Sequence, residues 1–148
     1  MTMHRHRRIG TQECVRGSAN MSHQLTHLAA AGVAASLLPP GAVAANTNGT
    51  GVSLAGQKGT AAAILNCGAA TAGTNPTMDV KLQESDDNST NWTDIAGAAF
   101  SQVTTVAKCQ VISFRPGERK QYIRAVATIG GTSSPSFPLS CSILTLPA

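Results

Sequence analysis

Hydrophobic and polar residues alternate along much of the chain, most clearly over Thr77–Ser85. The apolar residues of this tract share one parity: Met78, Val80 and Leu82. Because successive side chains of a β-strand point to opposite faces, the pattern predicts a half-buried strand. The tract Asp86–Asn91 that follows is rich in Asp, Asn and Ser, which favours a turn. A return strand is predicted at Trp92–Ile95.

Similar patterns predict further strands along the rest of the chain. They cover Ser36–Ala45, Gly51–Ala55, Thr60–Cys67, Phe100–Thr105, Lys108–Arg115, Lys120–Ile129 and Phe137–Leu146. Thr60–Cys67 is apolar at both parities, which is typical of a central strand. Loops are predicted at Gly68–Pro76 and Gly130–Pro135. The Asn-Gly pair within Asn46–Gly51 predicts a turn there.

Roughly eight or nine strands separated by turns predict an all-β fold, an antiparallel β-sandwich of the jelly-roll or Ig-like type. The sandwich is expected over residues 36–148, after an N-terminal arm over residues 1–35 that is basic and then Ala-rich. Hydrophobic residues make up 42% of the chain but aromatic residues only 3%. Since small side chains bury little apolar area each, we expect modest stability and a benefit from oligomerisation or docking onto a larger body.

The excess positive charge is concentrated at the start of the chain. Residues 1–20 hold four arginines against Glu13 alone: Arg5, Arg7, Arg8 and Arg16. The rest of the chain has seven Lys or Arg against six Asp or Glu, which is nearly neutral. Such an arm can bind nucleic acid or an acidic protein surface, or it can be a solvated tail. His4 and His6 lack the further Cys or His spacing of a metal site.

The Ala-rich run within His27–Ala45 has two interpretations. Its apolar stretch and the small residues near Ala45 resemble a secretory signal peptide. However, the basic cluster lies far upstream of the run, and the run is too short to span a bilayer. The alternative is an arm or short helix that leads into the first strand. Met21 offers another start, in which case residues 1–20 are an extension of the reading frame.

A second basic group comprises Arg115, Arg119, Lys120 and Arg124. Alternation along Lys120–Ile129 places Lys120, Tyr122 and Arg124 on one solvent face. This face can dock on an acidic partner surface or hold a salt bridge at its rim, and plain solvation is an equally good interpretation.

The four cysteines are Cys14, Cys67, Cys109 and Cys141, and no two form a C-x-x-C pair. Cys67 and Cys141 have the parity of apolar neighbours, so we expect both to be buried free thiols. A disulfide between Cys109 and Cys141 stays open as an alternative if the protein is exported.

The folded region offers little for catalysis. Every histidine lies within residues 4–27, so no Ser or Cys of the predicted domain has a His base from that domain. The acidic tract Glu84–Asn88, with Asp94 nearby, can be read as a Ca²⁺ site or as a hairpin turn, and its spacing favours the turn. We therefore expect no enzymatic activity, no cofactor and no metal.

Four segments together resemble a recurrent type of small structural protein of tailed-phage virions. They are Asn48–Leu54, Asp79–Asp87, Trp92–Phe100 and Tyr122–Thr128. The resemblance extends over about residues 36–146. It implies a capsid decoration, or cement, protein: a small β-sandwich on the outer capsid that ties capsomers together. The arm before Met21 and the cysteines depart from that family.

The resemblance implies binding to the major capsid protein and to other copies of the chain, as a dimer or trimer. It implies a place on the outer capsid surface after synthesis in the host cytoplasm, with no membrane and no specific nucleic acid as partner. The candidate contact residues are Arg5, Arg7, Arg8, Arg16, Arg115, Arg119, Lys120, Tyr122 and Arg124. The alternatives are a tail or head-fibre component, and an exported Ig-like or carbohydrate-binding module.

Overall fold

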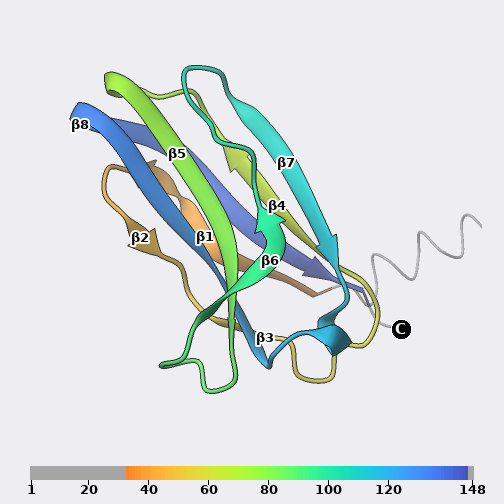
Figure 1. The fold of residues 1–148 in the computed structure, drawn as a ribbon. Helices are drawn as coiled ribbons and strands as arrows, with labels where there is room; N and C mark the ends of the chain where they lie inside the picture. The colour runs from red at the N-terminus through yellow and green to blue at the C-terminus, as the bar shows by residue number, and fades with distance from the viewer. Residues whose placement is uncertain (1–32, 147–148) are drawn as a thin grey trace, which may run out of the picture. The chain divides into compact units, whose positions relative to one another are not determined.

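The computed structural model describes residues 33–146, and Figure 1 shows how they fold. Their regular structure is eight β-strands and one short 3-10 helix, η1. The strands are β1 (Val33–Val43), β2 (Thr47–Asn48), β3 (Val52–Ser53), β4 (Ala61–Cys67), β5 (Ala72–Ser85), β6 (Thr93–Ala99), β7 (Lys108–Phe114) and β8 (Tyr122–Thr145), and η1 is Pro116–Glu118. All strand pairs are antiparallel, which confirms the predicted all-β antiparallel fold.

The long strand β8 joins two layers of the sheet (Figure 1). Its first half pairs with β5 on one side and with the short strands β2 and β3 on the other. Its second half pairs with β4 and β1. The strand order is β6-β5-β8-β4-β7. The sheet therefore curls until it is nearly barrel-shaped, with β6 and β7 as its two ends.

Two predicted loops are instead parts of bent strands. The sequence predicted loops at Gly68–Pro76 and Gly130–Pro135, but β5 begins at Ala72 and β8 is continuous. The two strands bend together at residues with positive φ: Gly73, Asn75, Gly131, Ser133 and Ser134. Pairing continues through register shifts on either side of Thr74. Gly and Asn therefore mark bulges here, because the backbone stays hydrogen-bonded across the bend.

Three other expectations need correction. The predicted strand Phe100–Thr105 forms only a single bridge, between Val103 and Met78. The predicted turn Asn46–Gly51 contains β2, and the N–H of Gly49 donates to the carbonyl of Ala125. The predicted strand Gly51–Ala55 shortens to β3. The strands predicted at Thr60–Cys67 and Lys108–Arg115 agree with β4 and β7 to within one residue.

The first strand begins at Val33, before residue 36, where the sequence predicted the domain to start. Its Pro39 and Pro40 lie within the register shift between Leu38 and Gly41, which suits residues that cannot donate to a strand ladder. Leu37 and Leu38 are fully buried. The apolar run with signal-peptide character thus supplies two core residues, and cleavage near Ala45 would remove them with β1.

The core confirms the predicted facing of the strands. Met78, Val80 and Leu82 are buried on β5, and Ile123, Ala125 and Ala127 are buried on β8. The end of β8 buries Phe137, Leu139, Cys141 and Ile143. β4 lies between β7 and β8, as its two apolar parities predicted. The core is built mainly from aliphatic side chains, as the scarcity of aromatic residues required.

The cysteines of the described region are free. Cys67 and Cys141 are buried, as predicted, whereas Cys109 is exposed. The alternative disulfide between Cys109 and Cys141 is excluded. Cys109 on β7 pairs with the exposed Asn66 of β4, and Cys141 on β8 pairs with the buried Leu65 of β4. Because Leu65 and Asn66 are consecutive and point to opposite faces of the sheet, the two thiols also lie on opposite faces. Cys14 lies outside the described residues.

Thiol reactivity should separate these residues in a Cys14→Ser variant. Burial raises the pKa of Cys67 and raises that of Cys141 to about 12, so both stay protonated and unreactive near neutral pH. We expect one thiol, Cys109, to react rapidly with a thiol reagent in the native protein, and all three to react in denaturant. Fewer than three thiols in denaturant without reductant would contradict the structure.

Candidate partner-binding surface

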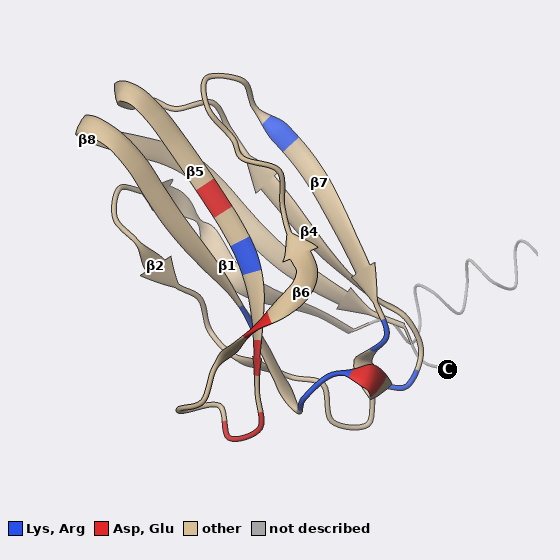
Figure 2. Ribbon diagram, viewed as in Figure 1, with Lys and Arg blue, Asp and Glu red and all other residues tan. Residues whose placement is uncertain are grey.

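Charge is divided unequally between the two layers (Figure 2). The layer of β2, β3, β5, β6 and the first half of β8 carries Asp79, Lys81, Glu84, Asp94 and Arg124. In the layer of β1, β4, β7 and the second half of β8, the only charged residue is Lys108. We call the first the charged layer and the second the uncharged layer. The segments Asn48–Leu54, Asp79–Asp87, Trp92–Phe100 and Tyr122–Thr128 all lie in or next to the charged layer.

A polar network crosses the outer face of the charged layer. The guanidinium of Arg124 lies over the ring of Trp92, 4.3 Å from its centroid. Its Nε and Nη2 donate to Gln83 Oε1 at 3.0 and 2.8 Å. Gln83 Nε2 donates to Asp94 Oδ1 at 2.8 Å, and Lys81 Nζ lies 2.7 Å from Asp94 Oδ2.

Neighbouring strands supply these residues because β5 pairs with both β6 and β8. Gln83 pairs with Asp94 on one side and with Arg124 on the other. The hydrogen bond from Lys81, with a second from Gln83, holds the pKa of Asp94 below its usual value. The network thus links Asp94 on β6, Gln83 on β5 and Arg124 on β8, and Trp92, just before β6, lies against the guanidinium.

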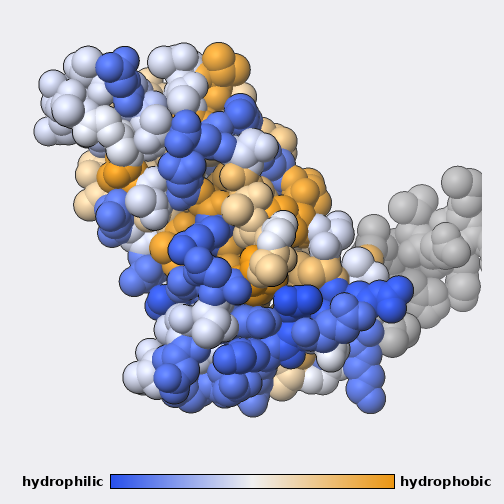
Figure 3. Space-filling view, in the orientation of Figure 1, coloured by the Kyte–Doolittle hydropathy of each residue, from blue (hydrophilic) through white to orange (hydrophobic). Residues whose placement is uncertain are grey.

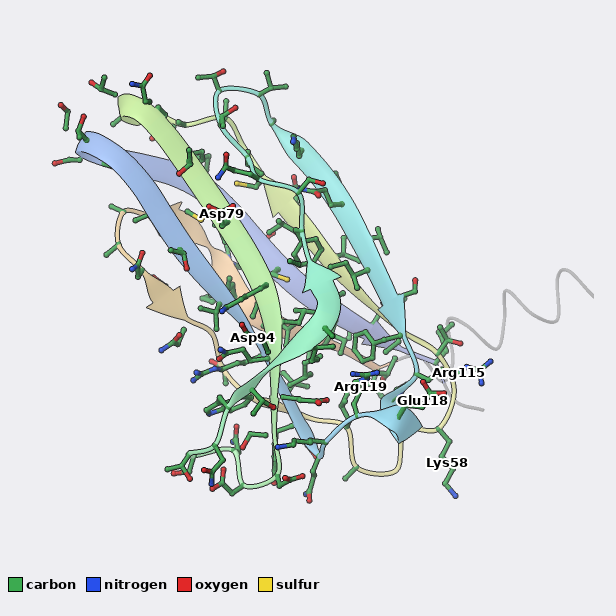
Figure 4. All side chains as sticks on the ribbon, in the orientation of Figure 1. Lys58, Asp79, Asp94, Arg115, Glu118 and Arg119 are labelled. Carbon is green, nitrogen blue, oxygen red and sulfur yellow. The ribbon has the colours of Figure 1, made fainter. Side chains whose placement is uncertain are left out.

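Arg115 and Arg119 flank η1 (Figure 4), and Lys120 follows Arg119 in the chain. Arg115 Nη1 lies 3.9 Å from Glu118 Oε1, and both side chains are largely exposed. Arg119 Nη1 lies 3.9 Å from Glu84 Oε2. Lys120 Nζ lies 3.4 Å from Asp86 Oδ2, and its backbone N–H donates to Glu84 Oε2. Each of these cations therefore has an acidic neighbour in the chain, so this end is mixed in charge rather than basic.

The two ends of the sheet leave a cleft between β6 and β7. It has a volume of about 290 Å³, and apolar side chains such as Ile95, Ile112 and Phe114 line it together with the charged Arg115 and Glu118. Figure 3 shows hydrophobic surface in this part of the molecule, above the hydrophilic end. Arg119 also lines the cleft, and its buried Nε has no hydrogen-bond partner. This cleft could not be predicted from the sequence, because its walls come from strands that do not pair with each other.

The turn after β5 is organised by Asp87. Its carboxylate accepts hydrogen bonds from the backbone N–H groups of Ser89 and Thr90, both at 3.0 Å, and from Thr90 Oγ1 at 2.7 Å. The buried Ser85 Oγ lies 2.7 Å from Asp87 Oδ1. The Asp87 carboxylate therefore stabilises the hairpin turn, which was one of the two interpretations of the tract Glu84–Asn88. No group of three or more His, Cys, Asp or Glu placed to hold a metal occurs within residues 33–146.

Acid should weaken this turn. The hydrogen bond from Thr90 Oγ1, followed by those from Ser89 N–H and Ser85, holds the pKa of Asp87 well below its usual range. A lowered folded-state pKa gives stability that is present above the unfolded value, about 3.9, and is lost as the pH falls through the folded value. We expect the melting temperature of Asp87→Asn to fall less than that of wild type between about pH 5 and about pH 2. Parallel melting curves for the two proteins would contradict this role.

The structure brings together some of the predicted contact residues and not others. Arg124 and Tyr122 lie on β8, and Lys120 and Arg119 precede it; Arg115 lies across η1 at the end of β7. Tyr122 is half-buried, and Gln121 Nε2 donates to its hydroxyl at 3.3 Å. The arm residues Arg5, Arg7, Arg8 and Arg16 lie outside the described residues. Sequence reasoning missed Trp92 and Gln83 as partners of Arg124. Gln83 lies opposite Arg124 on β5 and Trp92 immediately precedes β6, so their placement depends on the register of the folded sheet.

No protein-family model and no curated protein matches this chain. Within residues 33–146, no helix is long and apolar enough to cross a bilayer.

Proposed function

We propose that this chain is a non-enzymatic structural protein of a tailed-phage virion that decorates or cements the capsid. Its partner is the major capsid protein, and its place is the outer capsid surface. In finer terms, its two layers form a β-sandwich of the jelly-roll or Ig-like type, with β8 crossing from one layer to the other.

One observation carries this proposal: the segments that resemble decoration proteins converge on one sheet. Asn48 pairs with Val126, which also pairs with Lys81, and Glu84 pairs with Thr93. Segments that are far apart in sequence thus form one continuous surface, which is the outer face of the charged layer. A shared binding surface is a physical reason for such segments to resemble one family together.

The fixed polar network supports the use of this face for binding. Arg124 is held by Trp92 and Gln83, so little side-chain entropy is lost when a partner carboxylate or carbonyl meets it. The free thiols of Cys67, Cys109 and Cys141 agree with assembly in a reducing cytoplasm. The basic arm, with Arg5, Arg7, Arg8 and Arg16, offers a second linked contact that would raise the avidity for an assembled shell.

Co-sedimentation with undecorated heads of the same phage tests the proposal. We expect the wild-type protein to pellet with heads and to saturate. Arg124→Glu should reduce retention at least about tenfold, because the reversal places a carboxylate where the partner meets a cation. Lys58→Glu is the matched control, since it makes the same charge change on the loop between β3 and β4. Its retention should equal that of the wild type.

The possible outcomes separate two claims. No retention of the wild-type protein on heads would overturn the proposed function. Equal retention of wild type and Arg124→Glu would overturn the assignment of the charged layer as the binding face and leave attachment itself standing. Melting temperatures of all three proteins, measured alongside, show whether a loss of retention comes from unfolding.

A further inference from the structure

The seam between β6 and β7 is closed at one end and open at the other. These strands are the two ends of the strand order, so each has a backbone edge without a strand partner. Near the start of β7, Gln110 bridges the seam: its Oε1 accepts from the N–H of Ser101 at 2.7 Å, and its Nε2 donates to the Ser101 carbonyl at 2.8 Å. Farther along lies the cleft of about 290 Å³, between residues 95–98 and 112–115. Among the described residues, no hydrogen bond joins these two runs, so this part of the seam is open to a further segment.

The edge of β7 lacks the usual protection against strand addition. Natural sheet edges are blunted by Pro, by bulges or by charged residues. β1 carries Pro39 and Pro40, and the pairing of β6 with β5 is interrupted by a register shift. β7 contains no Pro, and its seven residues pair with β4 without a shift. Its one charged residue, Lys108, is its first, and the Nζ donates to the carbonyl of Gln102 at 2.7 Å.

The core is incompletely covered along this open part. Ile112 pairs with Ala63 and Phe114 pairs with Ala61, so all four side chains point to the inner face of the sheet. Ala61 and Ala63 are buried, but Ile112 and Phe114 are only half-buried, because they line the cleft. Apolar side chains placed over Ile112 and Phe114 would remove them from water, which is favourable in proportion to the area buried.

The charged residues of the cleft indicate what else a ligand carries. Arg115, Glu118 and Arg119 line it, and Figure 4 shows them at the end of β7. The Nη1 atoms of Arg115 and Arg119 each lie 3.9 Å from a carboxylate oxygen, of Glu118 and Glu84 respectively, which is too long for a hydrogen bond. The Nε of Arg119 is buried and has no partner. A buried donor without an acceptor is costly, and a carboxylate fits a guanidinium through two parallel hydrogen bonds.

We propose that the cleft receives a short extended segment of a partner protein, which adds antiparallel to the edge of β7 along residues 111–115. Two alternate apolar side chains of the segment cover Ile112 and Phe114, and a neighbouring carboxylate accepts hydrogen bonds from Arg119. In strand addition, main-chain hydrogen bonds provide affinity and side-chain contacts provide specificity. The antiparallel direction is that of every strand pair in the described sheet.

The size of the cleft limits the segment. A volume of about 290 Å³ lies at the lower end of ligand sites, so it takes only a few side chains. We expect a dissociation constant on the order of 1 mM for a single short segment. The proposal goes beyond the proposed function and does not depend on it, because it uses the seam and not the outer face of the charged layer.

A peptide titration of the full chain, followed through its amide NMR resonances, tests the proposal. The probe is the end-capped peptide Asp-Val-Thr-Val-Thr, whose two valines share one face and whose Asp is its only carboxylate. We expect saturable shifts at residues 95–98 and 111–115. The peptide with Asn in place of Asp should bind at least about fivefold more weakly, because hydrogen bonds between charged groups are the stronger ones.

Arg119→Gln tests the carboxylate contact. In this variant the Asp and Asn peptides should bind equally, because the guanidinium that distinguishes them is gone. Arg124→Gln is the matched control, since it makes the same replacement on the outer face of the charged layer, and it should keep the full difference. Melting temperatures of both variants show whether they are folded, and the peptide comparisons on the wild type stand without them.

N-methylation of the peptide tests the strand pairing. Methyl groups on alternate residues remove the N–H donors from one edge of an extended peptide at a time. We expect one of the two alternately methylated peptides to bind like the parent and the other to lose binding. No shifts at about 5 mM parent peptide would overturn the proposal. Equal affinity of the Asp and Asn peptides for the wild type, or of the two methylated peptides, would also overturn it.

Discussion

Replacing Leu82 or Ile123 by Ala should lower the free energy of unfolding by about 2–5 kcal/mol. Both side chains are 0% exposed, on neighbouring strands β5 and β8 of the charged layer. Truncation removes buried apolar surface and leaves a cavity that the surrounding sheet can only partly close. Chemical denaturation of each variant measures the loss. The dependence of the free energy of unfolding on denaturant concentration should match that of the wild type.

Lys81→Ala is the control for that measurement. Lys81 adjoins Leu82 but points outward, and its side chain is 41% exposed in its ion pair with Asp94. Exposed ion pairs contribute little, so we expect a cost under about 0.5 kcal/mol. Equal costs for Lys81→Ala and Leu82→Ala would show that the facing of β5 is wrong.

Gly49→Ala should destabilise the fold by about 3 kcal/mol, the upper end of what overpacking costs. A Cβ at this position would overlap the carbonyl oxygen of Leu37 and would lie 2.9 Å from that of Ala125. Both contacts are with backbone, so neither neighbour can rotate away. Residues 49 and 50 are hydrogen-bonded to both β8 and β1: the Gly49 N–H donates to the carbonyl of Ala125, and the Thr50 N–H donates to the carbonyl of Leu37. The movement needed to admit a methyl group would therefore disturb the attachment of β1 to β8.

Gly41→Ala is the matched glycine variant. A Cβ at Gly41 would meet nothing within 4 Å. We expect its stability to stay within about 0.5 kcal/mol of the wild type. Thermal melts of the two variants, read together, separate the close approach at Gly49 from the general effect of replacing glycine. A Gly49→Ala protein as stable as Gly41→Ala would contradict the packing of β1 against β8.

The alternation of hydrophobic and polar residues predicted the strands that have one face in the core and the other exposed to solvent. Thr77–Ser85 is the clearest case, because its buried residues alternate with polar ones. The same rule failed where backbone conformation decides the structure. Gly73 and Asn75 read as a loop, yet they form bulges that let β5 bend with β8. Gly49 read as half of an Asn-Gly turn, whereas it is needed for a close approach of three backbone segments.

The candidate surface was predictable only in part. The outward facing of Tyr122 and Arg124 followed from parity. The partners of Arg124 did not, because Trp92 and Gln83 come from segments whose register is a property of the folded sheet. The uncharged layer could have been noticed as three tracts without charge, Val33–Val43, Ala61–Cys67 and Phe137–Thr145. Their assembly into one face depends on the pairing of β8 with both β1 and β4, which no local pattern encodes.

Imaging of heads by electron cryomicroscopy, with and without added protein, tests the central claim most directly. The proposed function predicts extra density on the outer capsid surface into which residues 33–146 fit, with the charged layer facing the shell and Arg124 at the contact. Heads that show no added density at saturating protein would contradict the claim that this chain decorates a capsid.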